Sequence, residues 1–325
     1  MKLVNLTCAF TLQFTDCSSI TSVPLSATLL PLGSALGYVV AVLLVKRAAA
    51  QGVGLWRTAF VSNLAMGLCF APLWSLGGVP GEAAQWWQPG VCAALFFLGQ
   101  ALTFSALAGD VSLATPVMGL KILFVAAASS VLLEETVLPA WWLAAILSSA
   151  AVGLLQTGPR GAAESVSPHA LARGQSAGRT IILAALASLV FAVFEVLLQR
   201  FTLAWGAGRF LPITFGLVAL FSFGLIPFFH APLRSVPRAT WRWLAPGAWL
   251  LALQAAGMAY TLGTHGRATV ANILYSTRGL WSVLAVGFLG FWLGTGGEQK
   301  LPKSVLRRRL AGSGLMLVAV ALVLI

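Results

Sequence analysis

The sequence predicts an all-α polytopic membrane protein, with ten transmembrane helices arranged as two inverted five-helix repeats. Three observations lead to this prediction: an apolar composition, ten long apolar segments, and a similarity between the two halves of the chain. Hydrophobic residues make up 59% of the 325 residues and charged residues only 9%, whereas an ordinary soluble domain has about 25% charged residues. At a mean hydropathy of +0.91, the chain has too little polar surface to cover a soluble fold, so the apolar excess must face lipid.

A transmembrane helix needs about 20 mainly apolar residues, and ten segments fit this length. They lie near 26–45, 58–77, 90–108, 111–133, 140–157, 180–199, 210–229, 244–263, 268–293 and 310–325. Residues 1–25 are interrupted by polar side chains and lack a clear cleavage site, so we expect a poorly ordered leader there. The stretch 158–179 is rich in Gly, Ala, Ser and Arg and is predicted to be a flexible linker. It separates a first five-helix repeat, 26–157, from a second, 180–325.

The two halves match each other along two stretches. Residues 104–121 align with 261–278, which places Lys121 over Arg278, and residues 33–54 align with 187–208. Because each repeat has an odd number of spans, two repeats in tandem enter the membrane in opposite orientations. Inverted repeats of this kind are a recurrent plan of secondary transporters, with the substrate held near the membrane midplane. We therefore expect Lys121 and Arg278 to lie at similar depth and to face a shared cavity.

Lys121 and Arg278 are the main candidates for substrate binding. A cation at the centre of a spanning helix costs about 2.5–3.5 kcal/mol on insertion scales, so it needs a partner or a wet cavity. The pair would bind an anionic group such as a carboxylate; alternatively, each cation pairs with a buried acid or extends to the interface. Glu195 is the one acid predicted within a span. It would neutralise a cation, bind a cationic substrate, carry a coupling proton, or extend to the interface from near its helix end.

Five uncharged residues complete the candidate substrate site: Asn272, Tyr275, Trp281, Gln100 and Gln254. Asn272 and Tyr275 share one face of the ninth predicted span with its arginine, where they would line a wet wall or bond between helices. Trp281, one turn beyond that arginine, is expected to stack on the guanidinium or on a substrate. Gln100 and Gln254 are weaker candidates, with hydrogen bonding across helices as the alternative.

Several other classes of site have no support in the sequence. The four cysteines and three histidines lack metal-ligand spacing, so no metal or cofactor is expected. The net charge of +12 lies in connections between spans, and no run interleaves basic and aromatic residues as a nucleic-acid site would. ATP-driven pumping by this chain is excluded because it has no phosphate-binding loop. The expected partners are the lipid bilayer, a small-molecule solute and a coupling proton or ion, with a homodimer left open.

The five-plus-five organisation and the run LATPVMGLKILFVAAASSVLLEETVLPAWWLAAILSSAAVGLLQ, residues 113–156, resemble the EamA-type permeases of the drug/metabolite transporter superfamily. In that family a Pro-containing helix, an acidic residue just after it, and a small-residue-rich helix stand in this order. Pro116, Glu134 or Glu135, and AAILSSAAVG occupy those places here. The second half departs from the pattern, because it has no acidic residue where Glu134 would map. The resemblance implies a solute carrier and leaves the solute open.

We therefore expect a secondary membrane transporter, a permease or exporter of a small metabolite working by alternating access, and not an enzyme. The cationic pair gives a mild preference for an anionic or zwitterionic solute. The alternative is an intramembrane lipid-modifying enzyme that uses Glu195 with Lys121 and Arg278. The expected location is the cell (inner) membrane. Fourteen Lys and Arg fall on one side of the predicted topology and four on the other. This bias places both termini outside, whereas the resemblance implies both inside.

Overall fold

The structure is a computed structural model that describes residues 25–79, 81–107, 111–156, 177–282, 284–285 and 303–324. Within these ranges all regular secondary structure is helical and no strand occurs. The helices are α2 (Leu25–Ala50), α3 (Leu55–Phe70), η1 (Ala71–Leu76), η2 (Ala83–Gln85), α4 (Trp87–Leu107), α5 (Val111–Met118), α6 (Lys121–Leu132), α7 (Pro139–Gln156), α8 (Ala177–Trp205), α9 (Ala207–Phe221), η4 (Ser222–Phe228), η5 (Leu233–Ser235), α10 (Arg238–His265), α11 (Ala268–Ser276) and α13 (Lys303–Leu324). The predicted leader, apart from Leu25, and most of the predicted linker lie outside the described residues.

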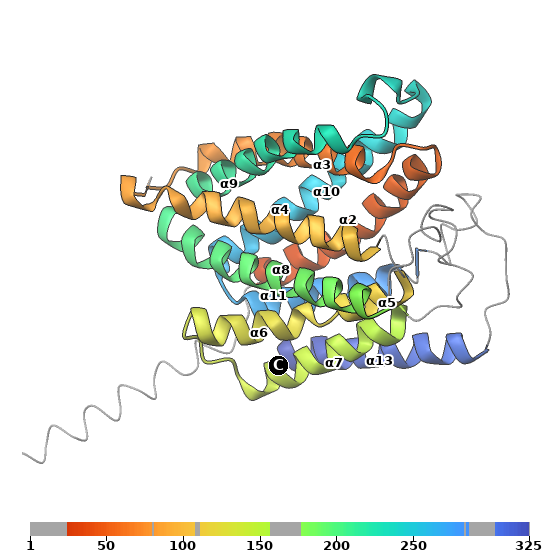
Figure 1. Cartoon of the computed structure of the whole chain (residues 1–325). Helices are drawn as coiled ribbons and strands as arrows, with labels where there is room; N and C mark the ends of the chain where they lie inside the picture. Colours follow the sequence, from red (N-terminus) through yellow and green to blue (C-terminus); the bar gives the residue numbers. More distant parts are fainter. Residues whose placement is uncertain are drawn as a thin grey trace, which may run out of the picture.

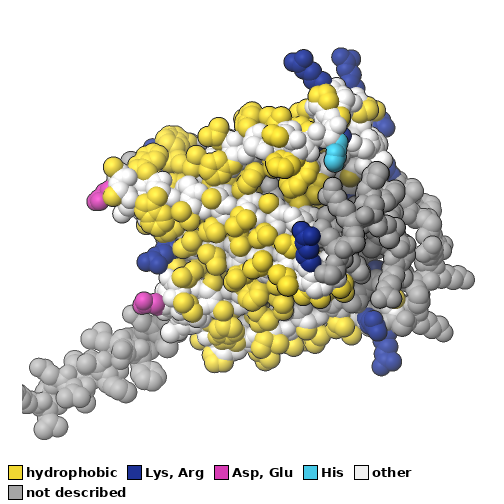
Figure 2. Space-filling view, in the orientation of Figure 1, with side chains coloured by type: hydrophobic (Ala, Val, Ile, Leu, Met, Phe, Trp, Pro, Cys, Tyr) yellow, Lys and Arg dark blue, Asp and Glu magenta, His cyan; other side chains and the backbone are white. Residues whose placement is uncertain are grey.

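Six helical segments of the described residues are long and apolar enough to cross a membrane: Leu25–Ala50, Leu55–Leu76, Ala83–Leu107, Leu113–Leu132, Ala177–Trp205 and Ala207–Phe228. Their outward faces carry large apolar side chains; Leu68 and Leu203, for example, are 63% and 55% exposed. Figure 2 shows hydrophobic side chains across the middle of one face, with most charged side chains toward its ends. A face of this kind fits lipid rather than water, so the chain has the features of an all-α, multi-pass membrane protein.

The other four predicted spans are less clear in the structure. α7 is apolar but shorter than the six, and α10 begins with basic residues and includes a proline. α13 begins with the basic stretch that contains Arg307–Arg309. The end of the ninth predicted span, 286–293, lies outside the described residues. The described residues therefore contain fewer clear spans than the ten that the sequence predicts.

Two of the predicted continuous spans are interrupted. The span 111–133 divides into α5 and α6 at Gly119 and Leu120, three residues after Pro116. A proline has no N–H to donate and therefore removes one backbone hydrogen bond of a helix. At the break itself, the carbonyl of Gly119 accepts a hydrogen bond from Ser149 Oγ at 3.0 Å. The ninth predicted span is not one regular helix in its described part, because α11 ends at Ser276, Thr277 forms a turn, and helix resumes at Arg278.

Helices from before the linker pack against helices from after it throughout the bundle (Figure 1). α2 packs along α10, α4 along α8, α3 against α9, and α7 against α13. α8 also contacts α5 and α6, while α11 contacts α2, α6 and α7. Phe70 of α3 and Phe215 of α9 stack in the main hydrophobic core, with ring centroids 3.8 Å apart. The polar residues near the helix breaks therefore lie among helices from both parts of the chain.

Two glycines join consecutive helices in comparable turns. Gly54 precedes α3 with a φ of 76°, and Gly206 precedes α9 with a φ of 83°. Positive φ favours glycine, because a side chain in this conformation is strained. Each of these helices continues directly into a 3-10 helix, η1 after α3 and η4 after α9.

Candidate functional site

The centre of the candidate site is an ion pair between Lys121 and Glu195. Lys121 is the first residue of α6, and its Nζ lies 2.5 Å from Oε1 of Glu195 on α8. The two side chains are only 16% and 9% exposed. α6 packs against α8, and this packing brings the lysine to the acid. Of the interpretations that the sequence allows for Glu195, neutralisation of Lys121 is the one this geometry matches.

Both carboxylate oxygens of Glu195 have partners. Oε2 accepts a hydrogen bond of 2.8 Å from Nδ2 of Asn272 on α11, whose amide also donates to the carbonyl of Ala268. The alternative in which Glu195 lies near a helix end and extends to the interface does not match this geometry. α8 continues through Arg200 to Trp205, so Glu195 lies well inside the helix and is 7% exposed. Lys121, Glu195 and Asn272 thus join α6, α8 and α11.

Arg278 lies just after the break at Thr277, and its guanidinium contacts two aromatic rings. Its guanidinium carbon is 4.9 Å from the ring centroid of Tyr38 on α2 and 4.8 Å from that of Tyr275 on α11. The two rings meet edge to face, at 6.1 Å between centroids. The Tyr275 hydroxyl donates to Oε1 of Gln254 on α10 at 2.8 Å. These contacts hold the two aromatic rings on the guanidinium from α2 and α11.

The charges of this cluster do not cancel. Arg278 is close enough to Lys121 and Glu195 to interact electrostatically with both. Two cations and one acid leave a formal charge of +1. In the described part of the chain, the only ion pair is that of Lys121 with Glu195, so Arg278 has no carboxylate partner there. A single anionic group would balance the remaining charge, since cations in an apolar setting require a counter-ion.

The remaining predicted site residues separate into two groups. Asn272, Tyr275 and Gln254 belong to the cluster, as described. Gln100 on α4 instead forms a reciprocal amide pair with Asn63 on α3, with N–O distances of 3.0 and 3.2 Å. This pair is the cross-helix bond that the sequence offered as the alternative for Gln100. Trp281 was expected to stack on the Arg278 guanidinium or on a substrate. It is 36% exposed, and the two rings that contact this guanidinium are those of tyrosines.

Sequence reasoning missed three residues with polar or aromatic contacts inside the bundle: Tyr38, Asn63 and Gln199. Tyr38 lies in an apolar stretch with no charged neighbour, so only its contact with Arg278 identifies it. Asn63 and Gln199 are almost fully buried polar residues. Their occurrence in apolar spans was the available signal, since buried amides need hydrogen-bond partners.

A second polar network lies at one end of the bundle. Nε2 of Gln199 donates to Oε1 of Glu135 at 2.7 Å, and Oε1 of Gln199 accepts from the backbone N–H of Ala268 at 2.9 Å. Burial raises the pKa of Glu135, while the hydrogen bond from Gln199 and the charge of Arg267 oppose that increase. This network fixes the start of α11 against α8 and the loop before α7, and so positions the helix that carries Asn272.

The described residues contain no group of three or more His, Cys, Asp or Glu arranged to hold a metal ion. Comparisons with known proteins add evidence on the fold. No family model matches the chain, and no curated protein matches its sequence. A solved structure described only as "Crystal structure of protein" is similar over 92% of this chain and 98% of its own. The TM-score is 0.64 at 18% sequence identity, so the similarity shows a shared fold and carries no function.

Proposed function

We propose that this chain is a secondary membrane transporter that carries a small anionic or zwitterionic solute by alternating access. The observation that carries the proposal is the site at Arg278. A guanidinium inside an apolar bundle is held between two tyrosine rings and has no acid partner among the described residues. It would bind a carboxylate or similar anion through charge-assisted hydrogen bonds.

The order of the elements supports an inverted repeat. After α2 and after α8 come, in the same order, a glycine with positive φ, a helix, two 3-10 helices, a long helix and a helix that is interrupted. We infer that α2 corresponds to α8, α3 to α9, α4 to α10, α5 and α6 to α11 and its continuation, and α7 to α13. In this arrangement the chain has ten spanning segments in two units of five.

The packing of the helices is consistent with this correspondence. Exchanging each helix for its counterpart converts the contact of α2 with α10 into that of α8 with α4, and both contacts exist. The contacts of α3 with α9 and of α7 with α13 convert into themselves. A pseudo-twofold relation predicts this set of contacts, and transporters built from inverted repeats work by movement of one repeat against the other.

The two cations occupy corresponding places at helix interruptions. Lys121 follows the break at Gly119 and Leu120, and Arg278 follows the break at Thr277. Interrupted helices near the membrane midplane are where secondary transporters bind their substrates, because free backbone groups are tolerated only beside a site or cavity. The resemblance to EamA-type permeases leads to the same class of function.

The lipid-modifying alternative is less well supported. A general acid or base must be free to exchange a proton with a substrate. Both oxygens of Glu195 are occupied, one by Lys121 and one by Asn272. We therefore assign Glu195 to holding Lys121 and organising the site rather than to catalysis.

The proposal can be tested by thermal stabilisation of the purified protein with metabolites sorted by charge. At 100-fold excess over the Kd, a bound ligand stabilises the folded state by about 2.7 kcal/mol. We expect anions to stabilise the wild type. Arg278→Gln should lower the apparent affinity for these anions at least tenfold. Arg278→Lys keeps the positive charge and is expected to retain part of the stabilisation by anions. Arg200→Gln is the control, because Arg200 is an exposed arginine that donates to the Leu132 carbonyl.

Stabilising compounds would then be tested for counterflow into proteoliposomes. Exchange of labelled solute that depends on Arg278 supports a carrier. Lipid turnover without solute exchange would support the lipid-modifying enzyme instead. The proposal fails if no anion stabilises the protein, or if Arg278→Gln responds as the wild type does.

A further inference from the structure

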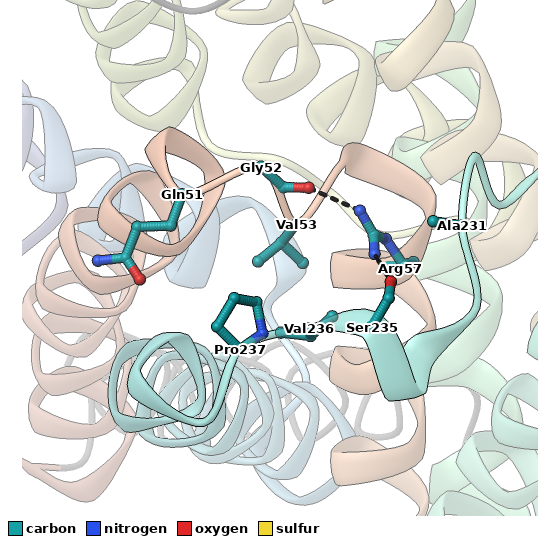
Figure 3. Close-up of a pocket in the computed structure, with 8 residues that line it drawn as sticks. All are labelled: Gln51, Gly52, Val53, Arg57, Ala231, Ser235, Val236 and Pro237. Atoms are coloured by element: carbon teal, nitrogen blue, oxygen red, sulfur yellow. Dashed lines mark hydrogen bonds between the residues drawn. The ribbon is translucent and has the colours of Figure 1, made fainter.

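A pocket of about 250 Å³ lies where α2 meets α3 (Figure 3), and no residue of the cluster around Arg278 lines it. On one side it is lined by the turn 51–53 and by Arg57, the third residue of α3. On the other side it is lined by Ala231 and by residues 235–237, which lead into α10. Its volume is about eight times the ~30 Å³ that one water molecule takes up in the liquid. A tetrahedral phosphate group therefore has room in it.

Arg57 is a buried cation in this pocket. The residue is only 8% exposed, and its Nη2 donates to the Gly52 carbonyl at 2.6 Å. Its Nη1 lies 3.4 Å from Oγ of Ser235, which is near the upper limit for a hydrogen bond. A guanidinium has five N–H donors, so these two acceptors leave donors for a further ligand.

The surroundings of Arg57 are basic. Neither 46–57 nor 230–243, the two segments that meet here, contains an Asp or Glu. No carboxylate of the described residues forms an ion pair with Arg57. A buried cation without a counter-ion is unfavourable, because it loses hydration without an opposite charge in exchange. The same segments carry further cations: Lys46, Arg47, Arg234, Arg238 and Arg242.

Arg209 shows how an arginine at the corresponding position is satisfied without a ligand. It is the third residue of α9, as Arg57 is of α3. Its Nη1 donates to the Trp74 carbonyl at 3.1 Å, and its guanidinium lies over the Trp74 ring at 4.2 Å from the centroid. Arg209 is also partly exposed, so water can solvate its charge. Within the described ranges Arg57 has no such ring contact, and a pocket adjoins it.

We propose that this pocket binds a phosphate group through Arg57. The pocket adjoins the ends of two spanning segments, Leu25–Ala50 and Leu55–Leu76, where phospholipid headgroups lie. Two sources share this chemistry: the headgroup of an anionic phospholipid and a phosphorylated small molecule. The neighbouring cations would attract either one. This site is separate from the solute site and does not depend on the proposed transport.

Native mass spectrometry of the purified chain in detergent can count bound ligands. The probes are phosphatidic acid, diacylglycerol with the same acyl chains but no phosphate, and glycerol 3-phosphate. The variants are Arg57→Gln, which removes the cation, and Ala231→Phe, which fills the pocket and leaves both hydrogen bonds of Arg57 in place. Arg209→Gln is the matched control. The thermal midpoint of each variant, measured without ligand, shows whether it folds.

We expect phosphatidic acid to bind the wild type and Arg209→Gln, with at least tenfold weaker binding to Arg57→Gln and Ala231→Phe. Diacylglycerol, which has no phosphate, should bind the wild type and all three variants to the same extent. If glycerol 3-phosphate also binds in an Arg57-dependent manner, the phosphate of a soluble ligand is sufficient; if only the lipid binds, the source is the membrane. The proposal is overturned if folded Arg57→Gln binds as the wild type does, or if neither phosphate probe binds. Should Arg57→Gln fail to fold, wild-type binding by Ala231→Phe overturns it.

Discussion

Replacing Glu195 by Gln should destabilise the fold strongly, although the shape of the side chain barely changes. The Gln carbonyl can still accept the hydrogen bond from Asn272, but the negative charge beside Lys121 Nζ is lost. The Lys121 side chain is 16% exposed, so water replaces little of the lost interaction. Removing one partner of a buried ion pair costs about 3–5 kcal/mol, mostly because the other charge is left uncompensated.

A double-mutant cycle separates this effect from a general loss of packing. Lys121→Met should also destabilise, whereas Lys121→Met combined with Glu195→Gln leaves no isolated charge. The double variant is therefore expected to be about 2 kcal/mol more stable than the sum of the single effects predicts, within the usual range of 0.5–3 kcal/mol for contacting residues. The assay is unfolding in mixed micelles followed by tryptophan fluorescence. Glu82→Gln, at an exposed acid outside the bundle core, is the control and should change stability by no more than about 0.5 kcal/mol.

Two results would refute this reasoning. Wild-type stability of Glu195→Gln would mean that the ion pair is not formed in the membrane protein. Strict additivity in the cycle would mean that the two side chains contribute independently. Either result would also remove the argument that Glu195 neutralises Lys121 and leaves Arg278 as the free cation.

Two further predictions concern the helix break and the network at the bundle end. Gly119→Ala should destabilise by about 1–3 kcal/mol, because the new Cβ would lie 2.9 Å from Val152 Cγ1; Gly153→Ala, with nothing within 4 Å, is the control and should stay within about 1 kcal/mol in the same unfolding assay. Burial raises the pKa of Glu135, so the folded state favours its protonated form. The resulting stability should be lost as pH rises from 4.5 through the higher folded-state pKa. A scan of thermal midpoint against pH should show this decline in the wild type and a flatter profile in Glu135→Gln, and equal slopes would contradict it.

The positions of the helices were largely predictable, because long apolar segments leave few alternatives to helices in a membrane. Each of the six clear spanning segments overlaps a predicted span. The interruption at Thr277 was not predictable in the same way. The sequence LYSTRG contains no proline, whereas the break between α5 and α6 follows Pro116. The length of α8 was also underestimated, because Gln199 and Arg200 resemble a helix end in the sequence.

Part of the membership of the candidate cluster was predictable from midspan polarity, but its pairing was not. Lys121, Glu195, Asn272 and Tyr275 were all identified from their unusual setting in apolar segments. Which cation the acid neutralises depends on how α6 and α8 pack, and no local pattern contains that information. Tyr38 has an ordinary apolar neighbourhood in sequence, so its contact with Arg278 requires the fold.

The proposed repeat explains why one cation is neutralised and the other is not. In the alignment of 33–54 with 187–208, Glu195 corresponds to Ala41 on α2, a buried residue that cannot form an ion pair. A duplicated unit would thus supply two cations at corresponding helix breaks, Lys121 and Arg278, but only one acid. The acid lies against Lys121, while α2 offers the ring of Tyr38 to Arg278. An aromatic ring stabilises a cation without neutralising it, so the charge remains available to an anion. The asymmetry between two equivalent positions, more than the presence of charge alone, is what favours an anionic solute.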